Sequence, residues 1–202
     1  MKKLFIPAQI KTKLNQSKIS KISKELPKKI AIAYSIQFKE VAEEIKKIIS
    51  KNHQITKLIQ VLGCSKPIFP KETQAVLLIS SGNFHAVSLA VESGLSIYLL
   101  EQDKLRKVSK QDMLNLEKKQ KASYLKFLHS DKIGILISTK PGQQNLKKAL
   151  EFKKNLKKKS YLFLCDNINS NEFENFRINS WVNTACLRLD MNEGSIINLN
   201  KI

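Results

Sequence analysis

The chain has 202 residues, of which 42% are hydrophobic, so it is long and apolar enough for one large or two small packed domains. It has no apolar run near the roughly 20 residues of a membrane helix. The apolar stretch at residues 4–7 is too short for a signal peptide. Both observations predict a cytoplasmic protein without membrane contact. A net charge of +19 favours acidic partners, although lysines that simply cover solvated faces explain it equally well.

Short apolar runs alternate with amphipathic segments along the chain. Strands are predicted, in chain order, at residues 29–35, 57–63, 74–82, 95–101, 132–139 and 160–166, with a last apolar stretch at 178–190. Helices are predicted at residues 38–52, 84–93, 109–131 and 143–159, with a short helical turn at 171–177. This alternation is typical of parallel sheets covered by helices. We therefore predict an α/β protein with two small, mainly parallel domains, residues 1–107 and 108–202, joined by a long helix.

Functional side chains of a parallel sheet are expected in the loops after the carboxyl ends of its strands. The candidate loops are residues 63–67, 80–85, 138–143, 165–167 and 183–188. Two glycine-bearing loops lead into helices, whose backbone amides could receive an anion or the carboxylate of a small ligand. Neither loop fits a dinucleotide-binding or P-loop motif.

The three cysteines, Cys64, Cys165 and Cys186, are widely spaced in a chain without an export signal, which argues against disulfides. Cys165 lies within an apolar strand and is interpreted as a small buried residue. Cys64 and Cys186 instead lie where a strand meets a loop. Because close-spaced zinc ligands are absent, a metal site would have to be assembled from distant loops. For His85, spacing leaves open an acid–base role, a substrate contact and a capping role.

Four segments occur together in one order, and each is a weak motif alone. They are "QVLGCS" at residues 60–65, "LLISSGNFHAVSLA" at 77–90, "GILISTKPGQQNLKKAL" at 134–150 and "INSWVNTACLRLD" at 178–190. As a set, they resemble the archaeal and eukaryotic diphthamide-biosynthesis family of 2-(3-amino-3-carboxypropyl)histidine synthases. The resemblance covers about residues 30–195 of the chain.

The resemblance implies three similar α/β domains, each giving one cysteine to a 4Fe–4S cluster whose fourth iron binds S-adenosylmethionine. The reduced cluster would break the Cγ–S bond of that cofactor, and a 3-amino-3-carboxypropyl radical would add to a histidine of elongation factor 2. The resemblance implies that Cys64 and Cys186 are the second and third cluster ligands and that Cys165 is not one. The residues that it implies at the cofactor cleft are Gly82, His85, Ser138, Gly142 and Gln143, where His85 contacts the cofactor or only shapes its loop.

The sequence departs from the family in two ways. No segment matches the domain with the first cysteine, and Leu187 stands where the family usually has proline. Because a cluster with one open iron needs three thiolates, we expect a separate polypeptide to supply the first domain, in an oligomer; the alternatives are that Cys165 substitutes or that the cluster is lost. Two other functions stay open. These are a non-catalytic partner subunit of a complete synthase and a basic RNA- or ribosome-binding module, although few arginines and few exposed aromatic residues disfavour the latter.

Overall fold

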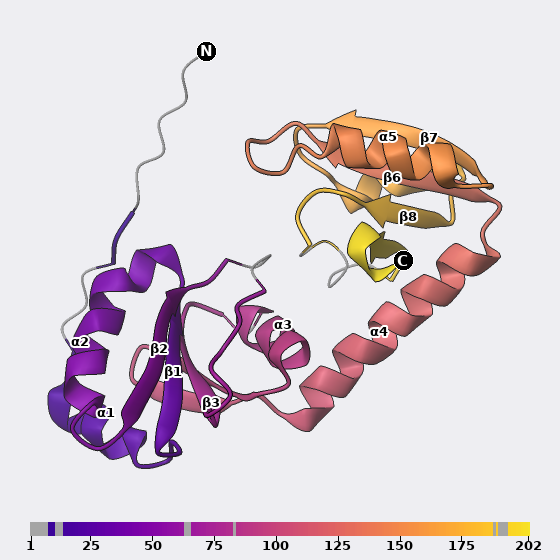
Figure 1. The fold of residues 1–202 in the computed structure, drawn as a ribbon. Coiled ribbons are helices and arrows are strands. Elements are labelled where there is room, and N and C mark those ends of the chain that lie inside the picture. The colour runs from indigo at the N-terminus through magenta and orange to yellow at the C-terminus, as the bar shows by residue number, and fades with distance from the viewer. Residues whose placement is uncertain (1–7, 11–13, 63–65, 83, 188, 190–193) are drawn as a thin grey trace. The chain divides into compact units, whose positions relative to one another are not determined.

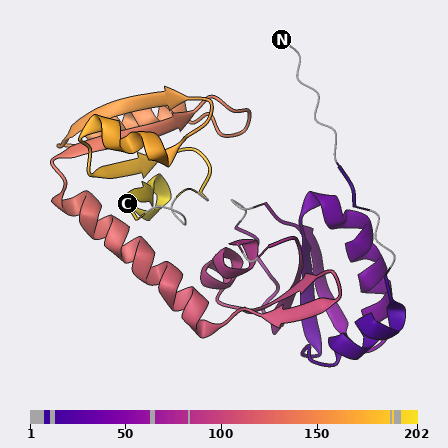
Figure 2. The same cartoon turned by 180° about the vertical axis from the view of Figure 1, so that it is seen from behind.

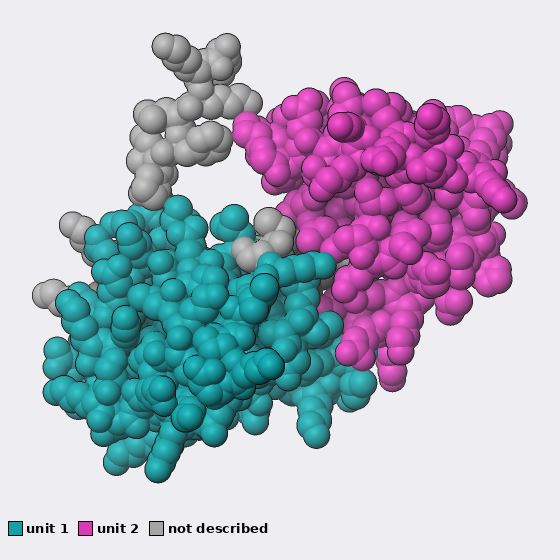
Figure 3. All heavy atoms as spheres, viewed as in Figure 1, with its two compact units in different colours: residues 1–114 teal, residues 115–202 magenta. Residues whose placement is uncertain are grey.

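The computed structural model describes residues 8–10, 14–62, 66–82, 84–187, 189 and 194–202 and is drawn in Figure 1. The chain folds as two compact units, residues 1–114 and 115–202, which are coloured separately in Figure 3. The boundary lies inside helix α4 (Lys110–His129), the long helix predicted to join the domains, rather than after residue 107. Within the described ranges, no helix combines the length and the hydropathy that a membrane span requires.

The first unit contains a five-stranded sheet in the order β2-β1-β3-β4-β5, in which only β5 runs antiparallel to its neighbour. Its strands are β1 (Lys29–Tyr34), β2 (Gln54–Gln60), β3 (Ala75–Ile79), β4 (Ser96–Glu101) and β5 (Lys104–Lys107). Its helices are α1 (Gln16–Ser23), η1 (Ile36–Phe38), α2 (Lys39–Ile49) and α3 (Phe84–Ser93). Helices α1 and α2 cover one face of the sheet and α3 covers the other, as Figures 1 and 2 show.

The core of the first unit follows from the amphipathic pattern of α2. Its apolar side chains recur at helical spacing, so Ile45 and Ile49 lie on one stripe and are at most 1% exposed. They pack against Ile32 and Leu77 of the two central strands. Ile19 of α1 completes the same cluster.

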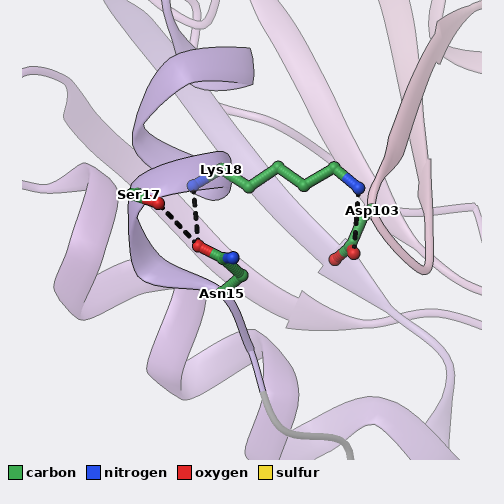
Figure 4. Close-up of polar contacts among 4 residues, drawn as sticks. All are labelled: Asn15, Ser17, Lys18 and Asp103. Atoms are coloured by element: carbon green, nitrogen blue, oxygen red, sulfur yellow. Dashed lines mark hydrogen bonds and ion pairs between the residues drawn. The ribbon is translucent and has the colours of Figure 1, made fainter.

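Helix α1 contains few apolar residues, so the sequence gives little indication of it. Polar contacts hold the helix in place (Figure 4). Asn15 caps its first turn, because the Asn15 Oδ1 accepts hydrogen bonds from Lys18 N at 3.1 Å and Ser17 Oγ at 2.7 Å. The Lys18 Nζ also pairs with Asp103 Oδ2 at 3.1 Å. This ion pair ties α1 to the turn between β4 and β5.

The second unit contains a four-stranded, fully parallel sheet in the order β7-β6-β8-β9. Its strands are β6 (Lys132–Ser138), β7 (Lys159–Cys165), β8 (Ser180–Asn183) and β9 (Ile196–Asn198), and its further helices are α5 (Leu146–Asn155), η2 (Ser170–Phe176) and η3 (Leu199–Lys201). Phe127 of α4 and Ala149 of α5 belong to the cluster on one face of the sheet. Phe173 of η2 packs on the other face. The predicted α/β class with mainly parallel sheets is confirmed in both units.

A glycine on β6 makes room for the largest buried side chain of the second unit. Gly134 lies opposite Trp181 in the β6–β8 register, and a Cβ added at Gly134 would lie 2.2 Å from Trp181 Cε3. The indole is 1% exposed. It stacks on Phe173 with the ring centroids 4.1 Å apart, and Phe163 meets it edge-on at 4.8 Å. The indole therefore fills the space over Gly134 and fixes strand β8.

Within the second unit, Lys158 connects the start of β7 to the carboxyl end of α4. Its Nζ donates hydrogen bonds to the carbonyl oxygens of Phe127 at 2.9 Å, Leu128 at 2.5 Å and Ser130 at 2.9 Å. The last carbonyls of a helix have no amide of a following turn to accept from, and a cation also interacts favourably with this end of the helix dipole. Lys158 thus differs from its neighbour Lys157, whose side chain is exposed.

Candidate functional site

Loops of the second unit meet at the carboxyl edge of its sheet. In the loop after β6, Ser138 is 2% exposed, and its Oγ donates to Asp166 O and accepts from Lys140 N, both at 3.2 Å. Thr139 donates from its amide to Cys165 O and from its hydroxyl to Asp166 Oδ1, each at 3.0 Å. The loop after β6 is thereby tied to the end of β7. Ser138 is a predicted cofactor residue, and its hydroxyl proton is used in the bond to Asp166 O, which follows β7.

Gly142 and Gln143 form a tight turn in the same loop. Gly142 has φ +77°, a backbone conformation that favours glycine, and Gln143 N donates to Lys140 O at 3.0 Å. Asn145, at the start of α5, then donates from Nδ2 to Thr184 O at 2.7 Å. This bond connects the turn to the loop that follows β8. The structure thus brings Ser138, Gly142, Gln143 and the Cys186 loop to one edge.

Cys186 lies in the loop after β8 and carries a free, half-buried thiol. The loop begins at Thr184, whose amide and hydroxyl both donate to Leu136 O, at 3.1 and 2.8 Å. The Asn183 Nδ2 donates to Cys186 O at 2.8 Å, and the Asn198 Nδ2 donates to Leu187 O at 2.7 Å. The backbone around Cys186 is therefore held by side chains from the strands below it, with no proline at position 187.

Cys165, at the end of β7, has a different electrostatic environment. Burial raises the pKa of the Cys165 thiol, and the nearby carboxylates of Glu172 and Asp166 raise this pKa further. The side chain borders a cavity of about 220 Å³ whose wall includes Phe163, Phe173 and other aromatic residues. These surroundings disfavour the thiolate of Cys165, which is the form that acts as nucleophile and metal ligand.

The first unit carries two of the predicted site residues in the segment from β3 to α3. Gly82 has φ +83°, and its amide donates to Glu101 Oε1 at 2.9 Å. His85, on the first turn of α3, lies with Nδ1 3.2 Å from Ser80 Oγ. Ser80 is 2% exposed, so it holds the imidazole against the end of β3. Cys64, the predicted cluster ligand of this unit, lies outside the described residues.

The second unit carries two free, half-buried thiols, Cys165 and Cys186, at the carboxyl edge of its sheet. Among the residues that the structure describes, no group of three or more His, Cys, Asp and Glu side chains could hold a metal ion. A cluster held by three side chains would therefore need at least one ligand from outside the described residues. Sequence reasoning missed the polar side chains that hold the Cys186 loop, Asn145, Thr184, Asn183 and Asn198. The two strands that end in asparagine, "SWVN" and "IIN", were the available signal.

Comparison with known proteins gives consistent matches over nearly the whole chain. A family model described as "Putative diphthamide synthesis protein" matches residues 1–196. A curated 2-(3-amino-3-carboxypropyl)histidine synthase of Pyrococcus horikoshii is 25% identical over 205 residues, which cover 94% of this chain and 60% of that protein.

Two crystal structures of Dph2 from Pyrococcus horikoshii share the fold. Both match with a TM-score of 0.78, at 23% and 22% identity, and the second contains a 4Fe–4S cluster. The alignments cover 92% of this chain and 59% or 60% of the Dph2 chains. The chain thus spans about 60% of the length of the relatives that it matches.

Proposed function

The chain belongs to the diphthamide synthesis protein family, and we propose that it is part of a 4Fe–4S, S-adenosylmethionine-dependent 3-amino-3-carboxypropyl transferase. The substrate is a histidine of elongation factor 2, and the reaction is the first step of diphthamide biosynthesis. The observation that carries this proposal is the free thiol of Cys186. It lies in a loop at the edge of a parallel sheet, and hydrogen bonds hold the backbone of that loop.

In this proposal Cys186 and Cys64 bind iron. When bound and reduced by an external electron donor, a 4Fe–4S cluster would supply the one-electron chemistry that cleaves the Cγ–S bond of S-adenosylmethionine and frees the 3-amino-3-carboxypropyl group for transfer. The proposal does not assign the third thiolate of the cluster to Cys165, because burial and two nearby carboxylates disfavour the thiolate form of Cys165 by raising its pKa. We propose that a separate polypeptide brings this third thiolate.

The other predicted residues hold the cofactor or shape the loops around it. The backbone amides of Gly82 and Gln143 already donate to Glu101 and Lys140, so these two turns shape their loops, and the Gln143 side chain is the polar group that the second turn could present to S-adenosylmethionine. Ser138 acts through its loop, because its hydroxyl donates to Asp166 O. His85 is oriented by Ser80, which suits a fixed polar contact to a ligand.

The test is anaerobic reconstitution of the chain with and without a chain that carries the family's first domain. Iron and sulfide per chain are measured, together with transfer of label from S-adenosylmethionine to elongation factor 2. We expect the assembled protein to bind iron and transfer label, C64S and C186S to lose both, and C165S, the matched control, to keep both.

Three results would contradict parts of the proposal. A cluster and activity that survive in C186S would exclude the assigned ligand. A full cluster and full activity from this chain alone would exclude the separate polypeptide. Activity of a complex with a complete synthase that is unchanged in both C64S and C186S would make the chain a non-catalytic partner subunit.

A further inference from the structure

Two asparagines occupy equivalent positions at the ends of neighbouring parallel strands. Asn183 is the last residue of β8 and Asn198 is the last residue of β9, and the two are register partners. Asn183 is 0% exposed and Asn198 is 3% exposed. Buried primary amides are costly unless their donors and acceptors are satisfied, so their partners indicate what the pair does.

Among the described residues, the hydrogen-bond partners of these two side chains are the other asparagine and the backbone of the Cys186 loop. The Asn183 Nδ2 donates one hydrogen to Asn198 Oδ1 at 2.5 Å and the other to Cys186 O at 2.8 Å, while the Asn183 Oδ1 accepts from Ala185 N at 2.9 Å. The Asn198 Nδ2 donates to Leu187 O at 2.7 Å. Both hydrogens of the Asn183 amide are therefore used.

We propose that Asn183 and Asn198 form an amide clamp that positions the thiol of Cys186 for iron binding. The clamp holds backbone groups of the residue before Cys186, of Cys186 itself and of the residue after it. With the backbone fixed on both sides, rotation about χ1 is the main freedom left to the thiol. The inference deepens the proposed function and rests on it for the role of the iron, while the clamp itself can be measured without metal.

The clamp uses an amide at both positions, but Asn183 donates two hydrogen bonds and Asn198 donates one. An aspartate at position 183 would keep the acceptor for Ala185 N and lose both donations, so that its oxygen would face the oxygens of Cys186 and Asn198. An aspartate at position 198 would still accept from the Asn183 Nδ2 and would lose only the donation to Leu187 O. Both substitutions preserve side-chain shape, so N183D is expected to act more strongly than N198D.

The first experiment uses the metal-free chain, with I135V as control. Ile135 is fully buried on the opposite face of the same sheet, so I135V lowers the thermal midpoint without contact with the clamp. Hydrogen exchange of residues 184–187 is measured by mass spectrometry, and alkylation of Cys186 by iodoacetamide is compared with that of Cys165 in the same molecules. We expect both rates in the loop to increase several-fold in N198D, to increase further in N183D, and to stay at the wild-type value in I135V.

The second experiment uses the chain reconstituted with its cluster in the assembled complex. Loss of a residue that orients a metal ligand typically weakens metal affinity 10- to 100-fold, so transfer of iron to a chelator should be about tenfold faster in N198D than in wild type. The electron paramagnetic resonance spectrum of the reduced cluster should change in N198D and not in I135V, even where both variants have equal thermal midpoints.

The outcomes separate the two proposals. Equal exchange and alkylation rates in N198D, N183D and I135V would overturn the clamp, whatever the iron content. Altered loop rates with an iron-release rate and spectrum equal to those of I135V would overturn its role in positioning the ligand. A wild-type complex that binds no iron would overturn the proposed function, and the metal-free rates would still decide whether the clamp exists.

Discussion

Substitution of Gly134 by alanine tests the packing that supports strand β8. The new Cβ would lie 2.2 Å from Trp181 Cε3 and 2.4 Å from Cζ3, well inside van der Waals contact. The indole is 1% exposed and stacked on Phe173 with centroids 4.1 Å apart, and a shift toward the cavity of about 220 Å³ that both rings line would disturb this stacking. Either the indole, with the helical turn η2 behind it, or the β6 backbone must therefore move.

The magnitude follows from two opposing effects. Overpacking of a tight core costs about 1–3 kcal/mol, and the buried indole places Gly134→Ala near the upper end of that range. Alanine loses less backbone entropy on folding than glycine does, which offsets about 0.5–1 kcal/mol. The net loss is about 2 kcal/mol, which for a folding unit of this size corresponds to a decrease in Tm of roughly 8–16 °C.

The assay is thermal and urea unfolding followed by circular dichroism, with G194A as a matched control. Gly194 belongs to the same unit, and a Cβ there would meet nothing within 4 Å, so G194A should unfold at the wild-type midpoint or slightly above it because of the same gain in backbone entropy. Equal midpoints for G134A and G194A would refute the reasoning. So would strict additivity of G134A and W181F in a double-mutant cycle, because a contact between the two residues must appear as coupling.

Two further predictions concern Lys158 and Cys165. Lys158→Met should lower the free energy of unfolding by about 2 kcal/mol, because the carbonyls at the end of α4 lose a charged donor. The control is the substitution of its exposed neighbour, K157M. Equal urea midpoints for K158M and K157M would contradict this prediction. Glu172→Gln should accelerate alkylation of Cys165, because burial and then the Glu172 carboxylate raise the pKa of this thiol. Removal of that charge lowers the pKa and increases the thiolate fraction at every pH below it, so the pH–rate profile measured from pH 7 to 10 should move to lower pH. A profile identical to that of wild type would exclude Glu172 as a cause.

Hydrophobic patterning was sufficient to predict most of the parallel framework. The strand predicted at residues 132–139 is β6 (Lys132–Ser138), and the one at 160–166 is β7 (Lys159–Cys165). The prediction at 57–63 is displaced from β2 (Gln54–Gln60), because the apolar Val61 packs beyond the strand. The strand β5 (Lys104–Lys107), with the sequence "KLRK", carries one apolar residue and gives no periodic signal. Its place depends on pairing with β4.

The ligand role of Cys186 stays a prediction from the sequence, and the side chains that support its loop could not be predicted. The strand–loop junction and the motif around it pointed to Cys186. The role of Asn198 depends instead on the register of β8 and β9, which brings together residues 15 positions apart in sequence. The helix predicted at 143–159 is shorter, α5 (Leu146–Asn155), because Asn145 bonds to Thr184 and Lys158 reaches the end of α4. Such contacts between elements carry no local signal.

The two thiols of the second unit lie at one sheet edge in different surroundings. Cys165 ends β7 beside Asp166 and Glu172, and these carboxylates oppose both its own ionisation and the approach of an anionic cluster. The Cys186 loop is held by Asn183 and Asn198, which have the shape of aspartate but no charge and which donate hydrogen bonds. Neutral donors therefore immobilise the backbone at Cys186 without adding negative charge where an iron–sulfur cluster and its thiolates would add their own.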